Sequence, residues 1–297
     1  MDKESQQERD DALTKARVLT EALPWINQMK GKTFVVKYGG SAMEDPKLRS
    51  AVISDLVLMK LIGIRLVIVH GGGKAISALM KRLDIGVRFQ DGMRVTDEAT
   101  MEAVQMALLG KVNQQLVGTM NSYGDYAVGL SGADGRILEG TPLSAELGRV
   151  GRVSKVGTEL IENLLDSGYV PMIAGVAMGA DGPLNVNADL VASEVARALH
   201  ADKLVFLTDV DGLYRDFSDK ASLISRLSLT ETRALLDSGE LESGMIPKIT
   251  ASAEALESGV GQVHILNGTF PHALLLEIFT DSGVGTMLYQ DEQDERA

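Results

Sequence analysis

Short apolar runs alternate with helix-length segments along almost the whole chain, and two of these runs end in clusters of glycines. The run Thr33–Val36 leads into Lys37-Tyr38-Gly39-Gly40, and the run Leu66–Val69 leads into His70-Gly71-Gly72-Gly73. Glycines at the end of a strand let backbone N–H groups and a nearby lysine approach a ligand closely. This arrangement favours binding of a negatively charged group such as a polyphosphate.

The alternation predicts the fold. We expect strands at 33–38, 66–70, 126–130, 136–138, 150–155, 170–175, 203–208, 262–266 and 285–289, and a β-hairpin at 86–95. Helices are expected at 46–62, 74–84, 97–122 (with Thr96 or Asp97 as N-cap), 158–167, 188–200, 230–237, 246–258 and 271–277. Strands separated by helices favour a parallel sheet that is covered on both faces. The expected fold is therefore α/β, a three-layer αβα sandwich around a mainly parallel open sheet.

The first 30 residues stand outside this alternation. An apolar stripe with spacings of four and three residues predicts a helix, which Pro24 should kink or restart: Ala12, Ala16, Leu19, Leu23 and Ile26. The helix either packs on its own domain or docks on another subunit. With the loop 178–183 as a candidate boundary, we expect an arm at 1–30, an N-terminal lobe at 31–180 and a C-terminal lobe at 181–297.

Composition excludes several classes of function. The chain has 297 residues, no cysteine and a formal net charge of −12. Absence of cysteine excludes disulfides and thiolate sites, and the acidic balance argues against a general nucleic-acid binder. No apolar run approaches the roughly 18 residues needed to span a bilayer. The polar segment Met1–Asp11 is not a secretory signal, so we expect a cytoplasmic protein with no membrane partner.

The common nucleotide and hydrolase motifs are missing. The fragment Gly31-Lys32-Thr33 lacks the first glycine of a Walker loop and precedes a strand, not a helix. No G-x-G-x-x-G fingerprint opens a helix after a strand, and there is no G-x-S-x-G elbow. Polyphosphate binding would therefore depend on the two glycine clusters. Each cluster also has a purely structural interpretation: Gly71–Gly73 could form a tight turn, and Lys37 could be a surface lysine.

Further polar groups are placed where open α/β sheets bind ligands. Asn185, Asn187 and Asp189 precede a helix, where they would either cap it or bind a ligand. Asp209 and Asp211 follow the strand 203–208, in a segment that is either a magnesium site or an ordinary turn. Lys248 lies near a helix N-terminus, where positive charge is unfavourable, and Arg94 is either a carboxylate clamp or a surface ion pair.

Seven blocks in one order resemble the amino acid kinase family, and within it the members that phosphorylate N-acetyl-L-glutamate in arginine biosynthesis. The blocks are VVKYGG at 35–40, VHGGG at 69–73, GMRVT at 92–96, NVNAD at 185–189, LTDVDGLY at 207–214, GMIPK at 244–248 and HALLLEIFTDSGVGTM at 272–287. The resemblance covers nearly the whole chain from about Ala22 onward. It implies ATP as phosphoryl donor and N-acetyl-L-glutamyl 5-phosphate as product.

The resemblance also implies a role for each candidate residue. Lys37 and Lys248 would hold the γ-phosphoryl group, and Asp189 would hold both lysines. The acyl acceptor would be bound by Gly72, Gly73, Arg94, Asn185 and Asn187. The nucleotide would be bound by Gly39, Gly40, Asp209, Asp211, Gly212, Leu213, Tyr214, Gly244 and Met245. Mg²⁺ would bridge the phosphates and be held mostly by ATP and water.

Leu23-Pro24-Trp25 and the stretch around Glu277 and Gly285 resemble the arginine-inhibited, hexameric branch of the family. This implies a trimer of dimers joined by N-terminal helices, with L-arginine as inhibitor at a site that includes Trp25, Lys220, Glu277 and Gly285. Some relatives in that branch bind a PII-type nitrogen signalling protein, and the sequence leaves this partner open. It also leaves open the plastid stroma as an alternative to a bacterial cytoplasm.

Two other functions are compatible with parts of the pattern. One is another acyl-phosphate-forming kinase of the family, such as a carbamate kinase. The other is a non-catalytic sensor with the same fold, against which the combination of Lys37, Asp189 and Lys248 argues.

Overall fold

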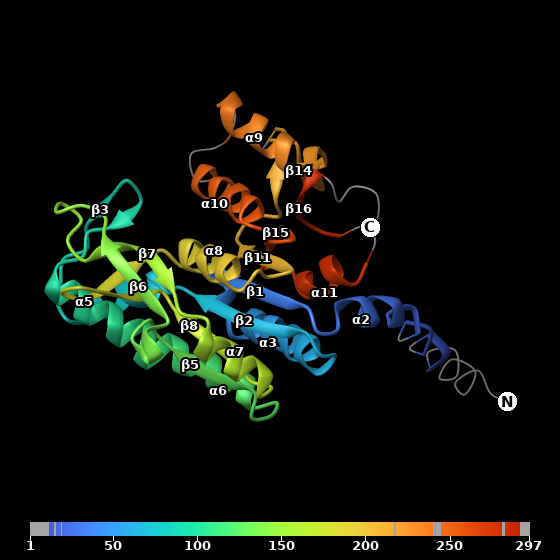
Figure 1. Cartoon of the computed structure of the whole chain (residues 1–297), viewed down its shortest axis with the longest axis horizontal. Coiled ribbons are helices and arrows are strands. Elements are labelled where there is room, and N and C mark those ends of the chain that lie inside the picture. Colours follow the sequence, from blue (N-terminus) through green and yellow to red (C-terminus); the bar gives the residue numbers. More distant parts are fainter. Residues whose placement is uncertain are drawn as a thin grey trace.

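The structure is a computed structural model that describes residues 12–14, 16–18, 20–216, 218–239, 241, 245–280 and 283–291. An eight-stranded sheet forms its centre (Figure 1). From edge to edge the strands are β14 (Arg226–Ser228), β16 (Thr286–Tyr289), β15 (Gln262–Asn267), β11 (Lys203–Thr208), β1 (Thr33–Tyr38), β2 (Arg65–His70), β8 (Val170–Ala174) and β5 (Ala127–Leu130). All neighbours pair in parallel except β15 with β16, which confirms the predicted sheet.

Alternate residues of the central strands fill two separate cores, because successive side chains of a strand point to opposite faces. Val35 faces the core that contains α7 (Glu159–Asp166), α8 (Ala188–Ala198) and α10 (Ile246–Glu257). Phe34 and Val36 face the core that contains α3 (Pro46–Leu61), α6 (Gln114–Asn121) and α11 (Ala273–Ile278). Figure 1 shows α8 and α10 above the sheet and α3 and α6 below it. The three layers predicted from the sequence are therefore present.

Several helices begin at signals that the sequence carries. Helix α3 starts at Pro46 after Asp45, whose carboxylate accepts hydrogen bonds from the N–H groups of Lys47 and Leu48. Helix α9 (Leu229–Ser238) begins with a capping box between Ser228 and Glu231. Such caps satisfy N–H groups that have no partner within the helix.

A small closed barrel lies beside the main sheet and was not predicted. Its strands are β6 (Leu138–Pro142), β7 (Val150–Val156), β9 (Val176–Gly179) and β10 (Gly182–Val186). Strands β9 and β10 form an antiparallel hairpin, and β10 also pairs with β7. The segment 178–183 is therefore a hairpin that belongs to one barrel rather than an open linker. A division into lobes near residue 180 stays a prediction.

Two short hairpins form separate two-stranded sheets. The pair β3 (Phe89–Gln90) and β4 (Met93–Arg94) lies within the hairpin predicted at 86–95. The pair β12 (Leu213–Tyr214) and β13 (Leu223–Ile224) was not predicted. Single 3₁₀ turns occur at η1 (Ser41–Met43), η3 (Asp134–Arg136) and η4 (Lys220–Ser222).

The long helix predicted at 97–122 is present, but its middle is wound differently. It consists of α5 (Glu98–Gln105), the π-helical segment η2 (Met106–Asn113) and α6, and Asp97 is its N-cap. Side chains of this run and of α4 (Gly73–Arg82) form a third core. A π-helix inside an α-helix is uncommon and frequently lies at a functional site.

The N-terminal segment restarts at Pro24, as predicted. Residues 12–14, 16–18 and 20–21 are helical, and α2 (Leu23–Met29) has Pro24 in its first turn. Figure 1 shows the described residues before α2 running away from the sheet, and Leu13 and Val18 are exposed there. Residues 1–11 and Leu19 lie outside the described part of the chain, and docking of the arm on another subunit stays a prediction.

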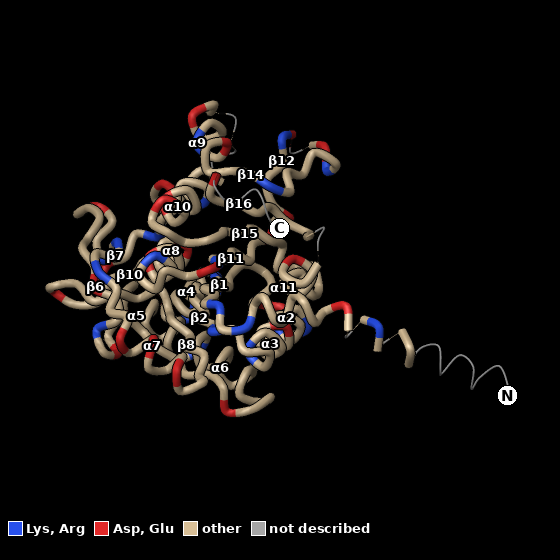
Figure 2. Tube along the Cα trace, turned by 45° about the vertical axis from the view of Figure 1, so that its right-hand side comes forward, with Lys and Arg blue, Asp and Glu red and all other residues tan. Residues whose placement is uncertain are grey.

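Within the ranges that the structure describes, no helix has the length and apolar composition to cross a bilayer. Figure 2 shows Asp and Glu spread over many elements, from α9 and α10 to α6 and α7. The negative net charge is therefore not gathered on one face.

Candidate active site

Three parallel strands bring the predicted site residues to one edge of the sheet. Lys37 of β1 lies opposite Val69 of β2 and Phe206 of β11. The glycines that follow β1 and β2 and the aspartates that follow β11 consequently leave the sheet at the same edge. Ligands of open α/β sheets bind at this carboxyl edge.

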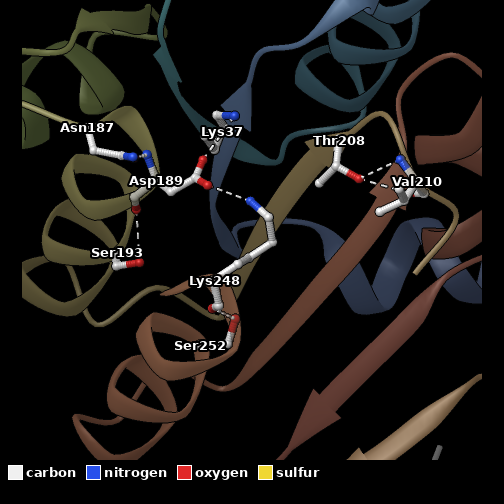
Figure 3. Close-up of polar contacts among 8 residues, drawn as sticks. All are labelled: Lys37, Asn187, Asp189, Ser193, Thr208, Val210, Lys248 and Ser252. Atoms are coloured by element: carbon white, nitrogen blue, oxygen red, sulfur yellow. Dashed lines mark hydrogen bonds and ion pairs between the residues drawn. The ribbon is translucent and has the colours of Figure 1, made fainter. Parts of the chain in front are cut away.

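At this edge two lysines contact one carboxylate (Figure 3). Lys37 Nζ lies 2.9 Å from Asp189 Oδ1, and Lys248 Nζ lies 2.5 Å from Asp189 Oδ2. The Lys248 contact is a hydrogen bond, whereas the Lys37 contact is an ion pair in which Oδ1 has no aligned donor. The structure thus joins β1, α8 and α10 at a single aspartate, as the resemblance implied.

Burial and charge oppose each other at this cluster. The side chains of Lys37 and Lys248 are only 15% and 11% exposed. Burial by itself raises the pKa of Asp189, but the charges of Lys37 and Lys248 outweigh it and hold that pKa below its usual range. Burial lowers the pKa of Lys248; Asp189 opposes this effect and the like charge of Lys37 adds to it. One carboxylate therefore partly neutralises two cations and leaves a net positive site.

Local structure fixes the positions of Asp189 and Lys248. Asn187 caps α8 by accepting a hydrogen bond from the Asp189 N–H at 2.7 Å, so the capping interpretation holds for this amide. Lys248 lies in the first turn of α10, with its amine 4.7 Å from the centre of the Phe206 ring. A helix start and an aromatic face thus hold the lysine against the aspartate.

A cavity of about 310 Å³ opens beside the cluster. It is lined by two of the predicted catalytic residues, Lys37 and Asp189, and by all five predicted acceptor-binding residues, namely Gly72, Gly73, Arg94, Asn185 and Asn187. Gly39 and Gly40, which were predicted to bind the nucleotide, also line it. Unpredicted residues also line it, among them Phe89, Leu143 and Leu190. All of the predicted acceptor-binding residues therefore line one cavity.

The glycines of the Gly71–Gly73 turn have different structural roles. A Cβ added at Gly72 would lie 2.7 Å from Leu108 Cδ2 and 3.1 Å from Val112 Cγ2. A Cβ added at Gly73 would meet no heavy atom within 4 Å. Packing therefore requires glycine at position 72, whereas the open space at position 73 permits close approach of a ligand to the backbone.

This difference predicts opposite effects of two alanine substitutions. Gly72→Ala should destabilise the fold by about 1–3 kcal/mol, because its methyl group is overpacked against η2. Gly73→Ala should change stability by less than about 0.5 kcal/mol yet reduce kcat/KM, since the methyl group fills ligand space. Thermal melts and steady-state kinetics on both variants test this. Full activity of Gly73→Ala would show that the glycine cluster is only a structural turn and does not bind the ligand.

Arg94 is a buried cation without a carboxylate partner among the described residues. It is 7% exposed, and its guanidinium donates to the Gly73 carbonyl at 3.0 Å and to Ser77 Oγ at 2.8 Å. The guanidinium carbon lies 4.8 Å from the centre of the Phe89 ring, and burial lowers the pKa of Arg94. A buried charge is costly unless it is paired, so this site is suited to an anionic ligand.

Asn185, the remaining predicted acceptor-binding residue, is linked through Thr96 to the strand that carries Arg94. Asn185 donates its side-chain N–H to Thr96 Oγ1 at 3.1 Å, and the Thr96 hydroxyl in turn donates to the Arg94 carbonyl at 2.7 Å. Strand β10 of the barrel is thereby connected to strand β4. The barrel positions Asn185 in the cavity wall.

Two predicted nucleotide-binding aspartates follow β11 at the same edge of the sheet. Asp209 accepts hydrogen bonds from the N–H and the hydroxyl of Ser41. Asp211 accepts from the Tyr214 hydroxyl and from the Asn267 amide. Both aspartates therefore have protein partners, as in the turn interpretation.

Gly212 and Leu213 belong to the same segment and contact β16. Leu213 donates its N–H to Thr286 Oγ1, and a Cβ added at Gly212 would lie 2.4 Å from the same oxygen. Met245 immediately precedes α10, and Gly244 lies outside the described residues. No group of three or more His, Cys, Asp or Glu side chains that could hold a metal ion occurs in the described ranges.

Three of the four predicted arginine-site residues line another cavity, of about 280 Å³, next to α2. They are Trp25, Glu277 and Gly285, and Lys203 and His264 line it with them. Glu277 accepts hydrogen bonds from His264 Nδ1 and from the N–H groups of Val284 and Gly285. Lys220 is placed elsewhere, with its amine 4.4 Å from the centre of the Tyr214 ring.

Sequence reasoning missed Ser77 and Phe89, which hold Arg94. Ser77 lies four residues after Gly73 and so one helical turn along α4. That spacing was visible in the sequence, but it gains meaning only when Arg94 is known to reach the same turn. Lys203 was missed because it begins a strand at the opposite end from the predicted site.

Comparison with known proteins agrees with this geometry. The sequence model of the amino acid kinase family matches residues 32–267. The acetylglutamate kinase of Caldanaerobacter subterraneus subsp. tengcongensis is 49% identical over 288 residues, which cover 96% of each chain.

Solved structures show the same fold. The N-acetylglutamate synthase from Neisseria gonorrhoeae, complexed with coenzyme A and N-acetyl-glutamate, matches with a TM-score of 0.81 at 28% identity, over 92% of this chain and 63% of that one. The carbamate kinase from Giardia lamblia bound to AMP-PNP matches with a TM-score of 0.66 at 18% identity, over 88% of this chain and 99% of that one. The second likeness concerns the fold alone.

A mainly parallel αβα sheet with two lysines and one aspartate at its carboxyl edge, together with the family match, identifies a phosphotransferase of the amino acid kinase class. The chain belongs to the amino acid kinase family, and within that family it groups with the acetylglutamate kinases.

Proposed function

We propose that the chain transfers the γ-phosphoryl group of ATP to the side-chain carboxylate of N-acetyl-L-glutamate, in the second step of arginine biosynthesis. The product is N-acetyl-L-glutamyl 5-phosphate. The observation that carries this proposal is the convergence of Lys37 and Lys248 on Asp189 beside a cavity lined by Arg94, which has no carboxylate partner among the described residues. The 49% identity to an acetylglutamate kinase supports the choice of acceptor.

The chemistry requires charge stabilisation more than proton transfer. A side-chain carboxylate is ionised at neutral pH, so the nucleophile needs no general base. Phosphoryl transfer spreads negative charge over the transferring oxygens, and catalysis is mainly positioning and electrostatic stabilisation. Lys37 and Lys248 supply two positive charges, and Asp189 holds the two amines in place in the absence of the phosphates.

The acceptor is held by one positively charged group and by neutral polar groups. Arg94 pairs with the α-carboxylate of acetylglutamate, and Asn185 binds the acetamido group. Asn187 contributes through the wall of the same cavity. The backbone N–H groups of Gly72 and Gly73 face the reacting carboxylate and the phosphoryl group, because N–H groups at a helix start have no intrahelical partner.

The nucleotide binds next to this cavity, against Gly39, Gly40, the segment 209–214, Gly244 and Met245. Magnesium enters with ATP. The described residues contain no group of three or more His, Cys, Asp or Glu side chains that could hold a metal, so the ion would be held by the phosphates of ATP and by water. When bound, it supplies neutralisation of phosphate charge.

A panel of acceptors tests the proposal directly. ADP release should be fastest with N-acetyl-L-glutamate and slow with carbamate, aspartate or glutamate. Arg94→Lys should raise KM for acetylglutamate, since an ammonium group cannot reproduce a bidentate contact. Preference for carbamate would instead indicate another kinase of the family, and absence of turnover with every acceptor would indicate a sensor.

We also propose that the cavity next to α2 binds L-arginine as an inhibitor in a homohexamer built as a trimer of dimers. Glu277 supplies a buried carboxylate for the guanidinium group, and Lys203 supplies a cation for the ligand carboxylate. Trp25 brings α2 to the same cavity, so ligand binding there is coupled to the N-terminal arm. Lys220 would join this site only through a change in the segment that carries it.

Removal of residues 1–26 tests the regulatory proposal. The truncated chain should form dimers and lose inhibition by arginine, while kcat is retained because the deletion lies away from Lys37 and Lys248. Glu277→Gln should lose inhibition with the hexamer intact. Sedimentation and inhibition curves distinguish these cases. A truncated enzyme that stays hexameric and fully arginine-sensitive would overturn the coupling.

A further inference from the structure

A buried histidine and a buried asparagine lie behind the glycine turn and have no role in the chemistry described above. His70 is the last residue of β2 and is 0% exposed, and Asn113 is the last residue of the π-helical segment η2 and is 2% exposed. The Asn113 side-chain nitrogen lies 2.8 Å from the Met172 carbonyl and 2.9 Å from His70 Nε2. His70 Nδ1 lies 3.0 Å from the Gly71 carbonyl.

These contacts determine which ring nitrogen carries the proton. A carbonyl only accepts, so the Asn113 atom facing Met172 is the NH₂ group, and its second hydrogen points to His70 Nε2. Nε2 must then be the acceptor, and the proton of a neutral ring lies on Nδ1, which donates to the Gly71 carbonyl. Burial lowers the pKa of His70 to about 4, while the hydrogen bond to Gly71 acts in the opposite direction. The ring is therefore neutral near pH 7.

The donor to the Gly71 carbonyl completes a set of three. The Gly72 carbonyl accepts from the Ile76 N–H at 2.9 Å, and the Gly73 carbonyl accepts from Arg94 Nη2 at 3.0 Å. In a planar trans peptide the N–H points away from the preceding C=O. Fixing the three carbonyls thus fixes the directions of the N–H groups of Gly72, Gly73 and Lys74.

The π-helical segment forms the support for this arrangement. Leu108 and Val112 of η2 occupy the space where a side chain of Gly72 would lie. A Cβ at Gly129 of β5 would lie 2.0 Å from Asn113 Oδ1, so glycine is needed there to admit the amide. The same segment therefore both packs against the turn and orients the histidine.

We propose that Asn113 and His70 are positioning residues for phosphoryl transfer: Asn113 holds the His70 ring in the form protonated on Nδ1, and the ring holds the Gly71–Gly72 peptide so that its N–H faces the reacting oxygens. The inference rests on the proposed transfer at this turn. It gives the π-helix a function, because η2 ends at the asparagine that sets the tautomer.

Two variants of Asn113 and one control test the inference. Asn113→Leu removes both donors and should lower kcat by about tenfold to a hundredfold, with smaller changes in KM. Asn113→Asp presents an acceptor to Nε2, so the proton moves to that nitrogen and the bond to Gly71 is lost. Acidification should restore it, because a doubly protonated ring donates from both nitrogens. The kcat of Asn113→Asp relative to Asn113→Leu should therefore rise as pH falls.

The control is Asn121→Leu, which removes an asparagine of α6 that bonds to Tyr126 and Ala127 and does not contact the turn. It should cost stability but little kcat in the folded protein. NMR of ¹⁵N-histidine-labelled wild-type protein, with the His70 signal assigned by His70→Gln, should show Nδ1 protonated and Nε2 bare. Nε2 protonated in the wild type, or equal kcat in Asn113→Leu and Asn121→Leu, would overturn the inference. The NMR result does not depend on the acceptor, so a wrong acceptor assignment would be recognised separately.

Discussion

Replacing Lys248 by alanine is expected to lower kcat by about a hundredfold, which corresponds to about 3 kcal/mol of lost transition-state stabilisation. The amine lies 2.5 Å from Asp189 in a site that is largely shielded from water, where a fixed charge acts more strongly than at the surface. KM for acetylglutamate should change less, because Lys248 is expected to act on the phosphoryl group. Steady-state kinetics with both substrates varied measure the two effects.

A surface lysine provides the matched control. Lys155 pairs with Glu139 at 3.2 Å, is 70% exposed and lies on β7, away from the lysine–aspartate cluster. Lys155→Ala removes the same side chain and should leave kcat unchanged. If Lys248→Ala turned over as fast as the wild type, the assignment of this lysine to catalysis would be wrong.

Replacing Asp189 by asparagine is expected to have an effect on kcat at least as large. The substitution keeps the shape but leaves two cations facing each other without a carboxylate, and removing one partner of a buried ion pair costs about 3–5 kcal/mol of stability. Lys37 and Lys248 would no longer be held at one point, and kcat should fall by more than about a hundredfold. Thermal melts and kinetics report the two losses separately.

The pH dependence of this variant gives a sharper test. In the wild type, burial and Lys37 lower the pKa of Lys248 while Asp189 opposes them. Without the carboxylate, the pKa of Lys248 falls further, so the amine loses its proton at a lower pH. The alkaline limb of the kcat profile should therefore move to lower pH in Asp189→Asn. An unchanged alkaline limb would show that Asp189 does not control the charge of the lysines.

Much of the fold could be predicted because its signals are local. Glycine-ended strands, capped helices such as α3 and the regular alternation each follow from a few adjacent residues. The barrel, the antiparallel partner β16 and the π-helical winding of η2 could not be predicted in this way. Each depends on which segment packs beside which, and that information is spread over the whole chain.

The candidate site could likewise be predicted only in part from the sequence. Lys37 and Lys248 are 211 residues apart (248 − 37), and no local pattern indicates that they meet at Asp189. Their roles came from the resemblance, whereas their distances come from the structure. The support of the glycine turn by His70 and Asn113 had no visible signal, because a histidine before glycines and an asparagine in a long helix are individually ordinary.

The central claim is that the chain forms an acyl phosphate on N-acetyl-L-glutamate. Trapping the product with hydroxylamine measures this directly, because an acyl phosphate reacts with hydroxylamine to give a hydroxamate, whereas free phosphate does not. We expect hydroxamate to form with ATP and acetylglutamate, in equal amount to the ADP released, and to fall in parallel with kcat in Lys248→Ala. Release of ADP without hydroxamate, or hydroxamate formed from aspartate or glutamate in preference to acetylglutamate, would contradict the account.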